Sequence, residues 1–252
     1  MSFDVAATSY DRFMGRYSVP LAPGLASFAG VTAGQRALDV GCGPGALATE
    51  LVARLGAGAV KAVDPSESFV LAARERLPGV QVERASADDL PFDDDAFDAV
   101  LAQLVVHFMP DPIAGLTEMR RVARPGGVVA ACVWDHAGGR GPLGVFWAAA
   151  RELDPAVHDE SDLPGAREGH LGTLFAAAGL RSIREVALDV QVEHPSFDEW
   201  WEPFTLGVGP AGAYTVSLPA DQQARLREGC HERRPTEPFV VTARAWTARG
   251  EA

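Results

Sequence analysis

The stretch Ala37-Leu38-Asp39-Val40-Gly41-Cys42-Gly43-Pro44-Gly45-Ala46-Leu47-Ala48 decides the fold of this chain. Its short apolar run, which ends in an acid and is bounded by turn residues, indicates a buried parallel strand. Three alternating glycines follow, and the apolar spacing of residues 46–53 predicts a helix. A strand, a glycine turn and a helix form half of a βαβ unit, whose turn opens at the carboxyl end of the strand, where open α/β sheets bind ligands. Because glycine lets the backbone approach a ligand closely, we expect a nucleotide-type site here.

The identity of the nucleotide depends on the residues around the glycines. Gly41, Gly43 and Ala46 fit the dinucleotide fingerprint with alanine in its last place, which is a weak signal alone. A turn without any ligand is the plainest alternative, but it would not need three glycines. The segment from Asp39 to Gly45 closely resembles motif I of the class I S-adenosylmethionine (SAM) dependent methyltransferases. The resemblance implies that the loop of Gly41, Cys42, Gly43 and Gly45 passes the methionyl part of SAM, and that Asp39 helps to hold its amino end.

Asp64 lies near the end of the second predicted strand, at residues 59–66. An acid at this strand end takes the ribose hydroxyls of an adenosine ligand, because its two oxygens accept both hydroxyl protons. Pro65 and Ser66 follow it and belong to the same expected cofactor site. The alternative is that Asp64 is only an acid at the start of the helix predicted over residues 66–77, but motif I upstream favours the ribose role.

The next two predicted strands, at residues 80–85 and 97–108, lead to further candidates. Ser86 to Phe92 resembles the loop that lies beside the adenine in this family, although the family usually has an aspartate where Ser86 stands. We therefore expect the backbone N–H of Ala87 to contact the adenine, with help from Ser86 or Asp88. Gln103 and His107 come at the carboxyl end of the central strand, near cofactor and acceptor. His107 is a candidate general base, although a packing or hydrogen-bonding role is commoner for such a histidine.

Residues 1–36 precede the first strand and are expected to form a lid or helices. Tyr10 to Ser18 resembles the N-terminal segment of a small-molecule branch of the family, the "type 11" or ubiquinone/menaquinone-methyltransferase-like group. The resemblance implies that Tyr10 and Arg16 close over the methionyl carboxylate, whereas the alternative is an amphipathic helix packed on the sheet edge. Pro20 and Pro23 are predicted to break the chain before a further helix.

The remaining chain completes an α/β fold. The resemblance implies a Rossmann-like class I methyltransferase, with a mostly parallel seven-stranded sheet, an antiparallel last strand and helices on both faces. We expect one domain over residues 1–252, with a SAM-binding core at 37–135 and insertions at 136–167 and 194–235 that shape the acceptor pocket. The four aromatic residues of segment 197–204 either cover an apolar substrate or anchor the insertion to the core.

The charge and cysteine content of the chain argue against several classes of binding partner. The chain has 252 residues, a net charge of −12 and 34 acidic against 22 basic residues, which argues against nucleic acid or an anionic membrane as partner. No apolar run approaches a membrane span, and Met1 to Ala6 does not resemble a signal peptide. Cys42, Cys132 and Cys230 are far apart and have no zinc-binding spacing, so we expect no metal site and a reducing cytoplasmic location.

The function implied by the resemblance is transfer of a methyl group from SAM to a small-molecule acceptor with apolar or aromatic character. Because the sulfonium of SAM is a good leaving group, alignment of the reactants would supply most of the catalysis. Two alternatives stay open: a nicotinamide-dependent oxidoreductase, and a SAM-binding module without activity.

Overall fold

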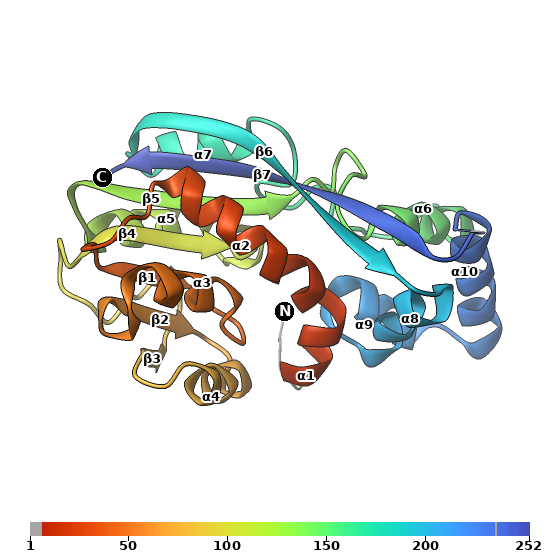
Figure 1. Cartoon of the computed structure of the whole chain (residues 1–252). Helices are drawn as coiled ribbons and strands as arrows, with labels where there is room; N and C mark the ends of the chain where they lie inside the picture. The colour runs from red at the N-terminus through yellow and green to blue at the C-terminus, as the bar shows by residue number, and fades with distance from the viewer. Residues whose placement is uncertain (1–6, 235) are drawn as a thin grey trace.

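A mixed sheet of seven strands forms the centre of the molecule (Figure 1). The computed structural model describes residues 7–234 and 236–252, so the expectation for Met1 to Ala6 lies outside the described residues. The strand order is β3-β2-β1-β4-β5-β7-β6, in which β7 runs antiparallel to both of its neighbours and the pairs from β3 to β5 are parallel. This confirms the predicted sheet. The strands are β1 (Ala37–Val40), β2 (Val60–Asp64), β3 (Gln81–Arg84), β4 (Phe97–Gln103), β5 (Ala123–Trp134), β6 (Arg181–His194) and β7 (Phe239–Glu251).

Helices cover both faces of this sheet, as expected. On one face α2 (Arg16–Ala29), α3 (Ala46–Leu55) and α4 (Glu67–Arg76) pack through a large apolar cluster. On the other face α5 (Pro112–Val122) and α7 (His170–Ala177) form a second cluster with the opposite sides of the strands. Every residue of β1 is buried, so its sequence does not alternate between apolar and polar residues, and Asp39 is its one charged residue.

The N-terminal segment differs from the prediction. After α1 (Ala7–Tyr10) and the π-helical turn η1 (Asp11–Gly15), helix α2 continues unbroken through Pro20 and Pro23, so the predicted break is wrong. Each proline removes a backbone N–H donor, but both lie on the exposed side of α2, where water can reach the unpaired carbonyls. The opposite side of the helix buries Leu21, Leu25 and other apolar residues against the core. Burial of the apolar side of α2 therefore outweighs the helix-breaking tendency of the two prolines.

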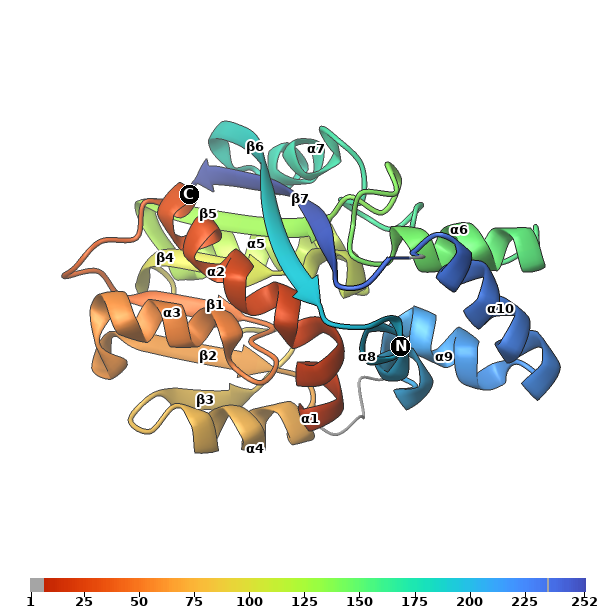
Figure 2. The same cartoon turned by 45° about the vertical axis from the view of Figure 1, so that its right-hand side comes forward.

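Helical segments lie beyond the carboxyl ends of the parallel strands (Figures 1 and 2). β6 and β7 extend past β5, and their outer parts, such as Glu193 and Val240, pair only with each other. An insertion between these two strands packs beside the helix that follows β5. The helical elements here are α6 (Gly144–Leu153), α8 (Phe197–Trp201), η4 (Glu202–Leu206), α9 (Gly209–Ser217) and α10 (Ala220–Glu232).

The aromatic residues of the insertion are buried. Phe197, Trp200, Trp201 and Phe204 are between 1% and 7% exposed. Phe204 stacks on Phe146 of α6 with a centroid distance of 4.6 Å. These contacts support the anchoring interpretation, because the rings hold the insertion on α6.

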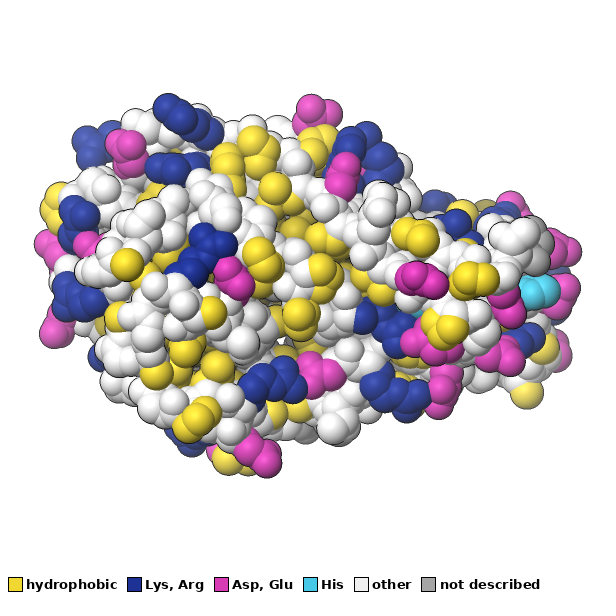
Figure 3. All heavy atoms as spheres, viewed as in Figure 1, with side chains coloured by type: hydrophobic (Ala, Val, Ile, Leu, Met, Phe, Trp, Pro, Cys, Tyr) yellow, Lys and Arg dark blue, Asp and Glu magenta, His cyan; other side chains and the backbone are white. Residues whose placement is uncertain are grey.

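Charged side chains of both signs are interspersed on the face seen in Figure 3, and no broad basic patch lies on it. Hydrophobic side chains gather in the middle of this face, between the sheet and the helical insertion. Within the described ranges, no helix combines the length and the apolar character that a membrane crossing requires.

Candidate active site

A cavity of about 500 Å³ opens at the carboxyl ends of the parallel strands. Its volume lies within the usual range of small-molecule sites, about 300–1,000 Å³. Residues from η1, α9 and the segments that follow β1, β2, β4 and β5 line it. The cavity brings together these candidates from the sequence: Tyr10, Gly41, Gly43, Asp64, Pro65, Ser66, Ser86, Ala87, Asp88, Gln103 and His107.

We divide the cavity into two halves. The cofactor half is formed by Gly41, Gly43, Asp64, Ser66 and Ala87, which all lie between β1 and the loop after β3. The residues that line the acceptor half include His107, His136, Leu143, Glu160 and Val208, which come from four separate segments of the chain.

The glycine loop of the cofactor half is fixed by backbone hydrogen bonds. The amides of Gly41 and Cys42 both donate to the Val63 carbonyl of β2, at 2.8 and 2.9 Å. Gly41 has a φ of 71°, and a Cβ there would lie 2.5 Å from Cγ2 of Val105. Gly43 has a φ of 53°, and a Cβ there would meet nothing within 4 Å. Gly41 is thus required for packing, whereas Gly43 keeps the cavity open.

Asp64 connects this loop to the start of α4. Its Oδ2 accepts a hydrogen bond from the Gly43 amide at 2.8 Å, and its Oδ1 accepts one from the Ser66 amide at 2.9 Å. Burial raises its pKa. Each carboxylate oxygen retains a second lone pair. The helix-start role and the ribose role are therefore compatible in the same side chain.

Asp39 lies beneath the loop and is 1% exposed. Neither of its carboxylate oxygens makes a hydrogen bond of good geometry, and burial raises its pKa to about 8 although the nearby Ala48 amide partly opposes the shift. A buried acceptor without a partner is unfavourable unless a ligand satisfies it. The ammonium group of SAM would supply such a donor, so this residue fits the expected cofactor.

Two other loop candidates do not line the cavity. Cys42 is buried, and its thiol donates to the Gly43 carbonyl at 3.4 Å. Burial raises the pKa of this thiol well above its ordinary value. Gly45 precedes α3 with a φ of 99°, where a Cβ would lie 2.9 Å from Cδ1 of Leu77. Both residues therefore support the conformation of the glycine loop from the side that faces away from the cavity.

The N-terminal segment contributes Tyr10 but not Arg16. The Tyr10 ring lies at the cavity and makes an edge contact with Phe69. Arg16 instead contacts His194 Nδ1 through Nη1 at 2.9 Å and forms an ion pair with Glu199. The structure therefore does not bring Arg16 into the cavity, because these two partners hold its guanidinium against the insertion.

Gln103 ends β4, and His107 follows it in the acceptor half of the cavity. The Gln103 amide donates to the Ser18 carbonyl at 2.9 Å, and its Oε1 is buried without a partner. His107 belongs to the short 3₁₀ turn η3 (Val106–Phe108). Burial, together with nearby His136, lowers the pKa of His107 well below its ordinary value. Its imidazole is therefore neutral at physiological pH, as a proton acceptor must be.

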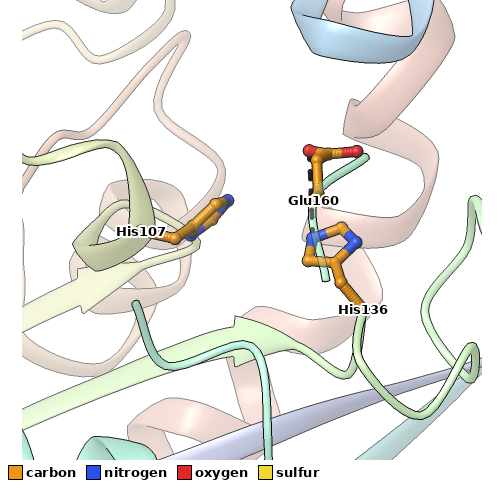
Figure 4. A group of neighbouring side chains, drawn as sticks. All are labelled: His107, His136 and Glu160. Atoms are coloured by element: carbon orange, nitrogen blue, oxygen red, sulfur yellow. Dashed lines mark ion pairs between the residues drawn. The ribbon is translucent and has the colours of Figure 1, made fainter. Parts of the chain in front are cut away.

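His136 and Glu160 were not identified from the sequence. His136 lies two residues after β5, at the same sheet edge as His107, so the strand-end rule that selected His107 would have found it too. Glu160 comes from the loop between α6 and α7 and carries no comparable signal. Figure 4 shows His107 on one side and His136 with Glu160 on the other.

Comparisons with known proteins agree with this geometry. Residues 38–131 match a family model described as a methyltransferase domain. A Mycobacterium tuberculosis protein described as uncharacterised is 34% identical over 175 residues, which are 66% of this chain and 61% of that protein. A demethylmenaquinone methyltransferase of Clavibacter sepedonicus is 42% identical over 104 residues, covering 40% of this chain and 41% of its own. The chain thus spans about three fifths of the length of the M. tuberculosis relative.

A solved structure supports the fold. The YcgJ protein of Bacillus subtilis superposes with a TM-score of 0.60 at 18% identity, over 93% of this chain and 97% of its own. The segment that the family model matches includes motif I, all but the first residue of β1, and the whole of β2, β3 and β4. This chain therefore matches a methyltransferase domain over residues 38–131, and its fold is similar to that of solved SAM-dependent methyltransferases.

Proposed function

We propose that this chain transfers a methyl group from SAM to a small-molecule acceptor. The observation that carries the proposal is one cavity that runs from the glycine loop to His107. A cofactor and an acceptor that share a cavity are held close together, and proximity alone lowers the barrier of a two-substrate reaction substantially.

The residues of the cofactor half have separate roles in this proposal. Gly41 and Gly43 allow the backbone to pass close to the methionyl part, and Asp39 accepts from the amino group. Asp64 accepts from the ribose hydroxyls, while Ser66, Ala87 and their neighbours enclose the adenosine. SAM supplies an activated methyl group on a sulfonium, so the chain has to orient the acceptor and exclude water.

An apolar or aromatic acceptor fits the opposite half best. Phe13, Met14, Trp134, Leu143 and Val208 all contribute to its lining. The named relative from C. sepedonicus is described as acting on demethylmenaquinone, a description that agrees with an apolar ring as the acceptor. His107 would accept a proton where the acceptor has to lose one.

The regions outside the SAM-binding core have separate roles in this proposal. We propose that residues 136–167 and 194–235 shape the acceptor pocket within one domain, since Leu143 and Val208 come from these two insertions. Residues 1–36 would then cover the cavity through Tyr10. Three buried free cysteines fit a cytoplasmic location.

A direct assay tests the methyl transfer. Purified protein is incubated with SAM and a panel of quinols, phenols and enolisable ketones, and S-adenosylhomocysteine and methylated product are measured together. We expect both to form in equal amounts with at least one acceptor, and the Gly43→Val variant to form neither. A chain that binds SAM tightly but methylates no compound of an extended panel would be a binding module, and hydride transfer to or from a nicotinamide would favour an oxidoreductase.

A further inference from the structure

Three metal-binding side chains converge in the acceptor half of the cavity. His107, His136 and Glu160 each offer one ligand atom, and these three atoms lie within 4.8 Å of one another (Figure 4). His107 is 5% exposed, and the side chains of His136 and Glu160 are 3% and 4% exposed. The three residues come from the turn after β4, the loop after β5 and the loop before α7. Their convergence is therefore a product of the tertiary fold.

Both imidazoles carry a buried nitrogen that lacks a hydrogen-bond partner. His107 Nδ1 and His136 Nε2 are inaccessible to solvent and are not satisfied by any described group. Buried polar atoms in folded proteins nearly always have a partner, because an unsatisfied one loses its hydrogen bonds to water without replacing them. His136 Nε2 is the nitrogen that lies near Glu160 Oε1, so an ion bound between these two atoms would satisfy it.

Glu160 is held in position by Trp147. The indole Nε1–H donates to Glu160 Oε2 at 2.9 Å, which leaves Oε1 directed toward His136. The distance from Oε1 to His136 Nε2 is 3.9 Å, too long for a hydrogen bond. Donor atoms that bind one metal at about 2.0–2.2 Å lie about 3 Å apart, so a closure of about 1 Å would bring this pair onto an ion. A hydrogen bond that orients a ligand from behind is a regular feature of metal sites.

We propose that His107, His136 and Glu160 bind one divalent transition-metal ion, which holds an oxygen of the methyl acceptor in the acceptor half of the cavity. Two imidazoles and one carboxylate favour zinc, iron(II) or cobalt over magnesium, which prefers oxygen ligands. Three protein ligands leave at least one position open, and this position faces the same cavity as the cofactor half. The acceptor class is thereby narrowed to compounds with a hydroxyl or enolisable carbonyl oxygen. With the ion bound, His107 would serve as its ligand and not as the general base, and the ion would lower the pKa of the acceptor oxygen.

Metal binding can be tested without any methylation assay. Protein stripped with a chelator is titrated with Co²⁺, and the visible absorption bands of the ion report binding and geometry. We expect one equivalent to bind, and the bands to change when acetohydroxamate, a probe with two oxygen donors, is added. His107→Gln, His136→Gln and Glu160→Gln should each weaken Co²⁺ binding at least a hundredfold, and Trp147→Phe should weaken it about ten- to a hundredfold.

Matched variants and a second ligand separate metal loss from misfolding. His158→Gln and Glu168→Gln change exposed residues of the loop that carries Glu160, and both should bind Co²⁺ like the unmodified protein. Each variant is also titrated with S-adenosylhomocysteine, which reports an intact cofactor half. If His107→Gln fails to fold, the loop variants His136→Gln and Glu160→Gln still carry the test.

Two results would overturn the proposal. One is the absence of stoichiometric Co²⁺ uptake by a protein that binds S-adenosylhomocysteine. The other is uptake that survives all three ligand substitutions, since the ion would then sit elsewhere. The metal ligation itself is independent of methyl transfer, while the role of the ion rests on the proposed function. Co²⁺ binding without methylation would therefore contradict the proposed function alone, and S-adenosylhomocysteine binding without Co²⁺ uptake would contradict the metal site alone.

Discussion

The two halves of the cavity are built in different ways. The cofactor half lies within one continuous run from β1 to the loop after β3, and backbone geometry holds it: amides of the glycine loop bond to β2 and to Asp64. The acceptor half collects side chains from four separate segments, and the hydrogen bond from Trp147 to Glu160 orients one of them. We therefore expect substitutions in the cofactor half to act through backbone conformation and hydrogen bonding, and substitutions in the acceptor half to act through side-chain chemistry.

The largest effect is expected at Gly41. Alanine there would occupy a left-handed conformation, at a cost of about 1–2 kcal/mol, and its Cβ would overlap Val105, which adds about 1–3 kcal/mol. Gly41→Ala should therefore lower the free energy of unfolding by about 2–5 kcal/mol, measured by urea denaturation. Gly34→Ala is the control, because Gly34 also has a positive φ but open space around its Cβ. Equal losses in the two variants would show that contact with Val105 contributes nothing.

Asp39 should make stability depend on pH. The pKa of its carboxyl is about 8 in the folded chain, against about 3.9 when unfolded, so the folded state binds more protons between these values. Ligand-free protein then loses about 1.4 kcal/mol of this group's contribution per pH unit as the pH rises through that window. Asp39→Asn keeps the shape without the charge, so its stability relative to the unmodified protein should rise by about 2–4 kcal/mol between pH 5 and 8. A difference that stays constant with pH would mean that Asp39 is ionised in the folded chain.

Asp64 tests the hydrogen bonding of the cofactor half. A bond to a charged partner contributes about 1.5–3 kcal/mol, so Asp64→Asn should weaken S-adenosylhomocysteine binding about tenfold or more in calorimetry. Asp111→Asn is the matched control: Asp111 also accepts from two backbone amides at the start of a helix, but it lies outside the cavity. If both variants bind the ligand with unchanged affinity, Asp64 serves only the loop and the helix.

The smallest effect is expected at Arg16. Its partly exposed ion pair with Glu199 contributes about 1 kcal/mol or less, and its guanidinium lies outside the cavity. Arg16→Ala should change the affinity for S-adenosylhomocysteine less than about threefold. The affinity for methylthioadenosine, which lacks the amino-acid end, should change just as little. A loss of tenfold or more that is confined to S-adenosylhomocysteine would show that Arg16 turns toward the carboxylate when the cofactor binds.

The cofactor half was largely predictable because its signals are local. Glycine spacing, the acid at the end of β1 and the acid at the end of β2 each depend on neighbours within a few residues. The seven-stranded, mostly parallel sheet with an antiparallel last strand followed from the family resemblance, and the structure confirms it. The cap at the start of α5 is equally local, because the Asp111 side chain accepts only from the nearby amides of Ile113 and Ala114.

The acceptor half could be predicted only in part. His107 follows a recognisable strand, but Glu160 reaches the cavity from a loop whose path depends on how α6 packs against the insertion. Arg16 was assigned to the cofactor by resemblance, whereas His194 and Glu199 become its neighbours only through the tertiary fold. The continuity of α2 through two prolines has the same origin, since burial of its apolar side is a tertiary effect.

Thermal unfolding in the presence of three ligands tests most directly whether the glycine loop binds SAM. A ligand that binds only the folded chain stabilises it by about 2.7 kcal/mol at a hundred times its dissociation constant. S-adenosylhomocysteine should raise the Tm by several degrees, methylthioadenosine should raise it less because it cannot satisfy Asp39, and NAD should leave it unchanged. A shift with NAD and none with S-adenosylhomocysteine would contradict the assignment of the glycine loop to a SAM-dependent methyltransferase.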